Sequence, residues 1–321
     1  MKKFGLEKRL LFIMAMIFAL VLTACDNAAR LEGEGDDGGE TEELAPEDIT
    51  IGLSVSTLNN PFFGKLENGV VETAEGQGST VQTVDAQDDT ATQINDIDDL
   101  IQQDVDILLI NPVDSDSIVP AVESANDADI PVITLDRSSS GGEVVTLIAS
   151  DNVEGGEMAA EYIADSVGED ANVVQIEGVP GASASNERGE GFNNIAEDQL
   201  NVFESQSGNF NRSEGLSVME NLLQSHSDID AVFSQNDEMA LGAMEALESA
   251  GLDDDVMVIG FDGNDDAIQS VEDGDLDGTV AQQPYDMGEL GVEAVYDHFS
   301  GETVEEEISS PLELVTADSE D

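Results

Sequence analysis

Basic residues are scarce in this sequence. Nine Lys and Arg stand against 72 Asp and Glu in 321 residues, and the formal net charge is −63 at pH 7. Nucleic-acid binding depends on basic side chains that displace counterions from the phosphates, so this composition argues against nucleic-acid partners. The hydrophobic fraction of 40% is still enough for a packed core. An acidic surface around such a core predicts a halophilic protein. In molar salt the Debye length is about 3 Å, so the repulsion among the negative charges of the protein is screened.

Histidine and cysteine are scarce as well, which excludes several kinds of active site. His226 and His298 are the two histidines, and no Ser/His/Asp arrangement or metal-ligand spacing accompanies them. No glycine-rich phosphate loop is present either. We therefore predict that the chain is not an enzyme, holds no metal and needs no cofactor. The single cysteine, Cys25, excludes an internal disulfide bond.

One long apolar run occurs, at the start of the chain. A basic segment, residues 1–9, precedes the apolar residues 10–22, and small residues follow before Cys25. This pattern predicts a secretory signal peptide over residues 1–24, and no later run approaches the ~20 residues that span a bilayer. Residues 22–25, Leu-Thr-Ala-Cys, resemble the bacterial lipobox, in which the cysteine thiol carries diacylglycerol. We expect lipidated Cys25 to anchor the protein at the extracytoplasmic face of the cell membrane, in the periplasm or at the cell surface.

The segment that follows Cys25 has almost no apolar residues. From Asp26 to Asp48 it is rich in Gly, Asp and Glu. Such a composition cannot bury enough apolar surface to fold. Residues 25–48 are therefore predicted to be a lipidated cysteine followed by a disordered acidic tether.

From Ile49 onward, short β-rich runs alternate with amphipathic stretches in which apolar residues recur at helical spacing. Strands are predicted in two series, at residues 51–55, 81–84, 107–110, 132–135 and 144–148, and at 173–176, 202–205, 231–233, 256–259 and 278–281. Helical spacing is clear at residues 94–101, 216–223 and 239–247. Alternation of this kind builds parallel sheets covered on both faces. Two series predict an α/β fold with two doubly wound lobes.

Ligands of doubly wound sheets bind at the carboxyl ends of the strands. The residues that follow the predicted strands are Ser56 to Phe63, Asn111-Pro112, Asp136-Arg137, Gln235-Asn236-Asp237, Phe261-Asp262-Gly263 and Gln282. Singly, each has a local alternative: Asn60-Pro61 as a helix start, Asn236 or Asp237 as an N-cap, Asp262-Gly263 as a turn, and Phe62 or Phe63 as core. Together they favour a site, because caps require neither aromatics nor arginines. Aromatic faces and paired polar groups suit a neutral polyol such as a sugar.

Several segments resemble the ribose branch of the type I periplasmic sugar-binding protein family. They are residues 55–63, 110–117, 130–137, 148–153, 188–192, 235–243 and 258–263. The resemblance implies two lobes joined by a hinge that the chain crosses three times, near Ser150, Gln282 and Pro311. It divides the chain into an N-terminal lobe, residues 49–150 plus 283–311, and a C-terminal lobe, residues 151–282 plus 312–321.

The same resemblance implies a function and a set of ligand contacts. The protein would be the monomeric substrate-binding lipoprotein of an ABC importer, closing on D-ribose or a similar monosaccharide before docking on a permease with a cytoplasmic ATPase. The implied contacts are Ser56, Asn60, Phe62, Phe63, Asn111, Asp136, Arg137, Arg188, Phe210, Asn236, Phe261, Asp262 and Gln282. By this resemblance Phe62, Phe63 and Phe210 sandwich the sugar ring, and the charged and amide side chains bond its hydroxyls.

The scarcity of cations supports this assignment. The predicted folded body has four Lys and Arg, namely Lys65, Arg137, Arg188 and Arg212, and two of them are among the implied contacts. We expect Arg212 to brace the neighbouring loop through an acidic partner and Lys65 to be ordinary surface.

Alternatives of other classes remain. A sugar-responsive repressor shares the fold but needs a basic N-terminal helix-turn-helix, where this chain has its apolar run and acidic segment. A receptor for chemotaxis or signalling, acting through a chemoreceptor, stays open. So does a related ligand such as allose, whereas the absence of Trp argues against a glucose/galactose-type protein.

Overall fold

The computed structural model describes residues 44–319. The predicted signal peptide, Cys25 and residues 26–43 of the predicted tether lie outside the described residues. The prediction of a disordered tether is wrong for residues 44–48. Pro46–Asp48 form a short 3-10 helix, η1, and Leu44 packs against the core. The hydroxyl of Ser79 also donates to the Pro46 carbonyl at 2.7 Å. A composition averaged over the whole segment could not reveal these local contacts.

The first sheet has the strand order β11-β5-β4-β3-β1-β2, and its neighbouring strands are parallel. Its strands are β1 (Thr50–Val55), β2 (Thr80–Asp85), β3 (Ile107–Ile110), β4 (Val132–Leu135), β5 (Leu147–Ser150) and β11 (Glu307–Ser310). The central strands are buried on both faces, which explains why they read as continuous apolar runs in the sequence.

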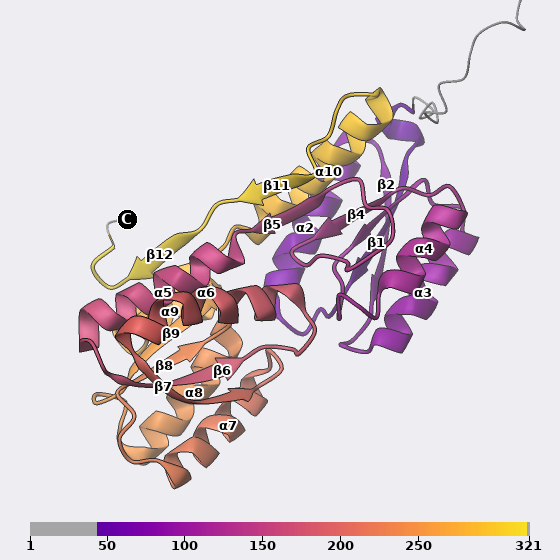
Figure 1. Ribbon diagram of the computed structural model, residues 1–321. Helices are drawn as coiled ribbons and strands as arrows, with labels where there is room; N and C mark the ends of the chain where they lie inside the picture. The colour runs from indigo at the N-terminus through magenta and orange to yellow at the C-terminus, as the bar shows by residue number, and fades with distance from the viewer. Residues whose placement is uncertain (1–43, 320–321) are drawn as a thin grey trace, which may run out of the picture. The chain divides into compact units, whose positions relative to one another are not determined.

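Helices cover both faces of this sheet, and we call the sheet with its helices the first lobe (Figure 1). One face carries α2 (Pro61–Gln77) and α10 (Pro284–Ser300), and the other carries α3 (Thr90–Gln102) and α4 (Val119–Asp127). Successive side chains of a strand point to opposite faces. Leu109 accordingly packs in the core under α2 and α10, whereas Leu108 and Ile110 pack under α3 and α4.

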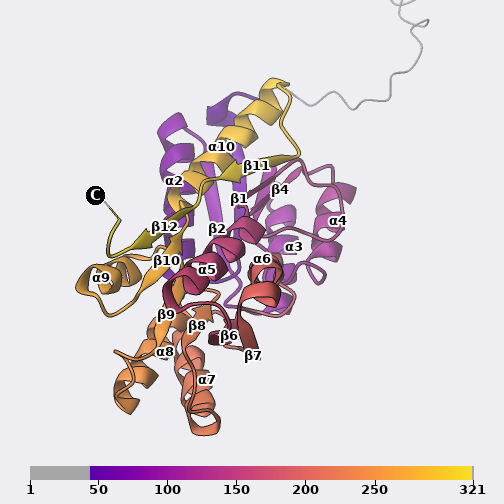
Figure 2. The same cartoon turned by 60° about the vertical axis from the view of Figure 1, so that its left-hand side comes forward.

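The second sheet has the order β12-β10-β9-β8-β6-β7. Its strands are β6 (Asn172–Glu177), β7 (Asn201–Ser207), β8 (Ala231–Ser234), β9 (Met257–Asp262), β10 (Gly278–Ala281) and β12 (Glu313–Thr316). On one face lie α5 (Asn152–Val167) and α6 (Ser183–Gln199), and on the other α7 (Arg212–Ser225), α8 (Asp237–Ala250) and α9 (Asp265–Asp273). Figure 2 shows the strands between these two groups of helices, and together they form the second lobe.

The chain passes between the two sheets at three places. β5 of the first sheet leads into α5, β10 of the second sheet leads into α10, and β11 leads directly into β12. Figure 1 shows β11 and β12, in yellow, as one extended stretch that joins the two sheets. β12 runs antiparallel to β10 and is the exception in a sheet that is otherwise parallel.

The doubly wound α/β prediction is confirmed, with two differences at strand level. The strand predicted at residues 144–148 lies at Leu147–Ser150, where β11 pairs with it in register. β11 and β12 were not among the predicted strands because each has at most two apolar residues in succession and lies partly exposed, with Glu307 and Glu313 at the surface. Edge strands of this kind lack the apolar run on which the prediction rested.

Candidate functional site

The first group of predicted site residues lies where β1 leads into α2. Asn60 is the N-cap of α2, and its side-chain oxygen accepts a hydrogen bond from the backbone N–H of Phe62 at 3.0 Å. Phe62 and Phe63 are buried, and their rings pack edge to face with centroids 5.1 Å apart. The local alternatives for these residues, a helix start and core packing, are therefore both realised. The same helix start fixes where all three side chains lie.

Asp136 and Arg137 follow β4 in a tight turn. The backbone N–H of Arg137 donates to the carbonyl of Leu135 at 2.7 Å, and Asp136 has a φ of 63°. A non-glycine residue in the left-handed region is strained, and such residues gather at functional sites. The side-chain NH₂ of Asn111 donates to the Leu135 carbonyl at 3.0 Å and to the Asp136 carboxylate at 3.3 Å. Its side-chain oxygen accepts from the backbone N–H of Ser56 at 3.1 Å, so one amide joins the ends of β1, β3 and β4.

The guanidinium of Arg137 is buried between groups of both lobes. It donates to the carbonyl of Pro112 at 3.0 Å, and its Nε lies 3.5 Å from the carboxylate of Asp136. Its central carbon lies 5.1 Å from the ring centroid of Phe63 and 5.3 Å from that of Phe210, distances at which a cation interacts with an aromatic face. Arg137 therefore links an aromatic ring of each lobe.

Arg188, on α6, is the corresponding cation of the second lobe. Its Nε donates to the side-chain oxygen of Asn152 at 2.8 Å, and its Nη1 donates to the Gln235 carbonyl at 2.6 Å and to the Asp262 carboxylate at 3.2 Å. The guanidinium also stacks over Phe261, with 3.8 Å between its central carbon and the ring centroid. Three polar partners and an aromatic face leave this side chain little freedom.

The remaining polar residues of the second lobe lie at the ends of β8, β9 and β10. Asp262 has a φ of 119°, and its Oδ1 accepts from the side-chain NH₂ of Gln282 at 3.0 Å. Asn236 caps α8 by accepting from the backbone N–H of Met239 at 3.0 Å, and it donates to the carbonyl of Phe210 at 3.3 Å. Phe210 itself has a φ of 57°. As with Asn60, the predicted cap and a place beside the cleft are both realised for Asn236.

Many of the predicted residues surround one small pocket between the lobes. It is lined by Asn60, Phe62, Phe63, Asp136, Arg137, Ala184, Arg188, Phe210 and Asp262. Its free volume is about 10 Å³, roughly the space that one water molecule needs. The other predicted residues are buried beside the lining. Asn111, Asn236, Phe261 and Gln282 contact it through the interactions described above, whereas Ser56 is joined to it only through Asn111.

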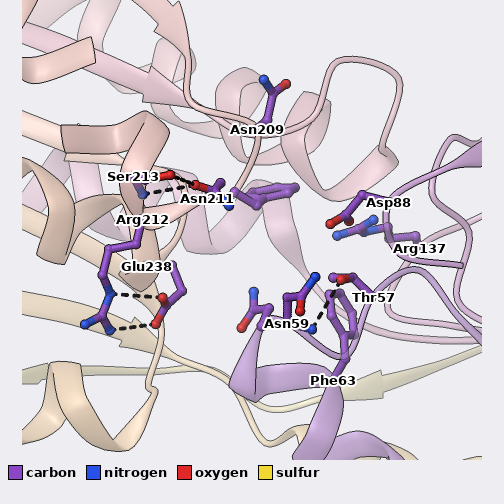
Figure 3. Close-up of a pocket in the computed structure, with 12 residues that line it drawn as sticks. Thr57, Asn59, Phe63, Asp88, Arg137, Asn209, Asn211, Arg212, Ser213 and Glu238 are labelled. Carbon is purple, nitrogen blue, oxygen red and sulfur yellow. Dashed lines mark hydrogen bonds and ion pairs between the residues drawn. The ribbon is translucent and has the colours of Figure 1, made fainter. Parts of the chain in front are cut away.

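A larger cavity of about 250 Å³ adjoins this inner pocket and shares Asn60, Phe63, Arg137 and Phe210 with it. Its lining includes residues that sequence reasoning did not assign to the site: Thr57, Asn59, Asp88, Asn209, Asn211, Arg212, Ser213 and Glu238. In Figure 3, Asp88 lies beside Arg137 on one side of the cavity, and the Arg212–Glu238 ion pair lies on the other. Asp88 follows the carboxyl end of β2, so applying the strand-end rule to the second strand would have found it.

The two lobes contact each other directly across the cleft. The contacts are the backbone N–H of Ser115 to the Gly181 carbonyl at 3.0 Å, the backbone N–H of Ser138 to the Ser183 hydroxyl at 3.0 Å, and Lys65 Nζ to the Asp265 carboxylate at 2.8 Å. The first joins two loops, the second joins a loop to the first residue of α6, and the third joins α2 to the start of α9. The structure is therefore closed around the inner pocket.

Each Lys and Arg among the described residues has an acidic partner. The pairs are Lys65–Asp265 at 2.8 Å, Arg137–Asp136 at 3.5 Å, Arg188–Asp262 at 3.2 Å and Arg212–Glu238 at 2.8 Å. The expected acidic brace for Arg212 is confirmed, and a second bond to Asp266 at 3.2 Å extends it to α9. The expectation for Lys65 was wrong, because its partner lies on the other lobe.

Burial controls the ionisation of the site. It raises the pKa of Asp136 against the opposing effect of Arg137 and Arg188, and it raises the pKa of Asp262 to about 6, again against Arg188. It lowers the pKa of Arg137, which Asp136 opposes, and it raises the pKa of Asp88. Desolvation disfavours the charged form of each group, so these charges depend on one another for stability.

Four buried polar atoms of predicted site residues have no hydrogen-bond partner among residues 44–319. They are the Ser56 hydroxyl, Asp136 Oδ1, Arg137 Nε and Gln282 Oε1. Such an atom costs about 1 to 3 kcal/mol when it is buried unpaired. Both lobes contribute, and the set offers donors and acceptors together.

Two absences concern the part of the chain that the structure describes. None of its helices has the length and apolar character that crossing a bilayer requires. Nor do three or more of its His, Cys, Asp or Glu side chains converge in a way that could hold a metal ion.

Two doubly wound lobes with a closed polar and aromatic pocket between them define a two-lobed solute-binding protein. The sequence model of the periplasmic binding protein domain family matches residues 51–303. The chain belongs to this family.

Its relatives agree with this class. The chain is 52% identical over 309 residues to the ribose import binding protein RbsB of Bacillus subtilis (strain 168), covering 96% of this chain and 99% of the relative. It is 49% identical over 267 residues to RbsB of Escherichia coli (strain K12), covering 83% and 90%. A solved ABC transporter periplasmic solute binding protein of Actinobacillus succinogenes 130z, with bound D-allose, is 29% identical with a TM-score of 0.78, covering 84% and 98%. These relatives are solute-binding proteins rather than enzymes.

Proposed function

We propose that this protein binds D-ribose in the cleft between its lobes. In this proposal it is the extracytoplasmic substrate-binding component of an ABC importer and delivers the sugar to a permease with a cytoplasmic ATPase. The RbsB relatives, about half identical over most of their length, support the ligand and the transport role. The inner pocket supports the chemistry, because aromatic rings and paired charged groups surround it.

The observation that carries the proposal is the set of unpaired polar atoms described above. Ser56 and Arg137 can donate, and Asp136 and Gln282 can accept. A pentose has hydroxyls on its rim, each of which donates and accepts, and apolar faces that pack on aromatic rings. A sugar bound here would pair the free atoms of Asp136 and Arg137, which line the pocket, and recover the free energy that their burial costs.

The proposed mechanism is a population shift. This closed arrangement leaves only about 10 Å³ free in the inner pocket, less than a monosaccharide fills, so the lobes must separate to admit the sugar and must close on it less completely than they do here. The three passages between the sheets, near Ser150, Gln282 and Pro311, would serve as the hinge. Once bound, the sugar contacts both lobes and favours the closed form, which the permease then recognises.

Export, lipidation and salt adaptation belong to the same proposal. Removal of residues 1–24 and diacylglycerol on Cys25 would hold the protein at the membrane, close to its permease. Mass spectrometry of the protein from membranes tests this, and a Cys25→Ser variant should be released in soluble form. The net charge of −63 supports a working environment of high salt, in which the fold should be most stable.

The binding proposal is tested by calorimetric titration of the mature domain, without Cys25, in high-salt buffer. We expect tight binding of D-ribose and much weaker binding of allose, xylose and galactose. A preference for allose is the second candidate, which the D-allose complex of a solved relative favours. Binding of another sugar would overturn ribose while keeping the transport role, and no binding of any sugar would overturn both.

A further inference from the structure

A buried carboxylate lies behind the second-lobe half of the site, and the mechanism above does not use it. Asp237 is the first residue of α8 and is completely buried. It lines neither the inner pocket nor the larger cavity. Its Oδ1 accepts from the hydroxyl of Thr279 at 2.7 Å, and its Oδ2 accepts from the backbone N–H of Asn264 at 2.7 Å. One carboxylate therefore ties together the start of α8, the β9–α9 loop and β10.

Each of these anchor points lies close in sequence to a proposed ligand contact. Asn236 directly precedes Asp237, and Asp262 lies two residues before the anchored Asn264. Gln282 lies three residues after Thr279. The proposed hydroxyl-binding residues at the ends of β8, β9 and β10 thus share a single anchor.

The turn at Asp262 and Gly263, which the hydrogen bond from Asn264 to Asp237 holds, has a strained backbone. Asp262 has a φ of 119° and Gly263 a φ of 73°. A side chain at Gly263 would come within 2.6 Å of Ala281, and one at Gly260 would collide with the carboxylate of Asp237. A strained turn persists where the surroundings determine its geometry, and here the surroundings include the hydrogen bond from Asn264 to Asp237.

We infer that Asp237 is a positioning residue for sugar binding, which acts by holding Asp262 and Gln282 in the orientation that the ligand requires. This inference rests on the proposed function. Its chemical logic is that each oxygen of the Asp237 side chain accepts a hydrogen bond from a different element, one from Thr279 and one from Asn264. Burial, with the nearby charge of Asp262, raises the pKa of Asp237, and the hydrogen bonds from Thr279 and Asn264 oppose that rise.

Two substitutions separate positioning from mere packing. Asp237→Ala removes both acceptors and frees the turn. Asp237→Asn keeps the shape: its oxygen can accept from the Asn264 N–H, and its NH₂ can donate to the Thr279 hydroxyl, which can turn to accept. We expect the dissociation constant for ribose to rise at least about tenfold in the alanine variant, and to stay within about threefold of wild type in the asparagine variant.

A double substitution tests whether Asp237 acts through Asp262. In an Asp262→Asn background, Asp237→Ala should weaken binding by much less than it does in wild type, because the residue it positions is already impaired. Titrations would be run well below the melting temperature of each variant, with circular dichroism as the check of folding. Should Asp237→Ala not fold, Thr279→Val removes one anchor and should raise the dissociation constant several-fold.

The outcomes are distinct. Wild-type affinity in a folded Asp237→Ala or Thr279→Val variant would overturn the inference, as would equal losses in the wild-type and Asp262→Asn backgrounds. Failure of Asp237→Asn to restore binding would also count against it. Absence of ribose binding in the wild-type protein would instead overturn the proposed function.

Discussion

The two lobes contribute similar chemistry to the cleft but assemble it in different ways. In the first lobe the carboxylate and the guanidinium are sequence neighbours, Asp136 and Arg137, on one turn that Asn111 holds. In the second lobe the corresponding pair, Asp262 and Arg188, comes from β9 and α6, and Gln282 adds a third element. The first half-site is therefore local, whereas the second depends on the packing of several elements.

This difference predicts that the second half-site is the more sensitive of the two. Arg188→Ala would leave Asp262 buried without its cation and would empty the space over Phe261. We expect the dissociation constant for ribose to rise at least about 30-fold, with a lower melting temperature. Titration calorimetry and thermal unfolding check this. Arg188→Lys is the matched control, since it keeps the charge without the fork of donors and should recover only part of the loss.

Substitutions in the first half-site should cost less. Arg137→Ala removes a looser ion pair and contacts with Phe63 and Phe210, and we expect about a tenfold loss of ribose affinity.

Phe210→Ala should weaken binding by several-fold or more, because it removes an aromatic face. Titration of each folded variant measures both effects. A loss for Arg137→Ala that exceeds the loss for Arg188→Ala would break the comparison, and wild-type affinity would refute the assigned role.

The pH dependence of sugar binding should arise mainly from Asp262 in the second lobe. Burial raises the pKa of Asp262 to about 6, so acid protonates it and weakens its attraction for Arg188 and for sugar hydroxyls. Affinity should be fully present above that pKa and should fall several-fold as the pH drops through it to about 5. Titrations across this range measure the change. Asp262→Asn should flatten the curve, and a curve that Asp136→Asn flattens instead would contradict this assignment.

The smallest effect is expected for the ion pair that joins the lobes. Lys65 and Asp265 are 34% and 89% exposed, so their pair contributes at most about 1 kcal/mol to closure. Lys65→Ala should raise the dissociation constant up to about fivefold at low salt and by less at high salt, because salt screens exposed charges. Titration at two salt concentrations measures this. Exchanging the two residues should restore affinity, and an equal loss at both salt concentrations would argue against an electrostatic role.

Sequence reasoning went furthest where the information is local. The central strands of both sheets were readable because buried parallel strands are continuous apolar runs, and Asp136-Arg137 was conspicuous because it directly follows one. The role of Lys65 was not readable, since its partner Asp265 lies 200 positions away. Asp237 is a similar case, because its bond to Thr279 spans 42 positions. Patterns along the chain show at which end of the strands a site lies. Contacts between residues that are distant in sequence appear only once the elements are packed.

Asn60 and Asn236 show a second limit of sequence patterns. Each was open to a local interpretation, Asn60 as a helix start and Asn236 as a cap, and to a functional one as a ligand contact, and each is a cap whose helix starts at the cleft. A cap uses the side-chain oxygen and leaves the NH₂ group for another partner. The two interpretations therefore do not compete, and no pattern of residues could have separated them.

The extended stretch formed by β11 and β12 has a consequence for how the protein stays soluble. β11 covers the edge of β5, and β12 covers the edge of β10, so ten residues near the C-terminus, 307–316, close one side of both sheets. Uncovered strand edges present unpaired N–H and C=O groups that recruit other chains. Exposed Glu307 and Glu313 place negative charge on the new edges, which repels such pairing. Until these last residues have been synthesised and docked, both lobes are open to aggregation through their edges, and truncation before residue 307 would make that exposure permanent.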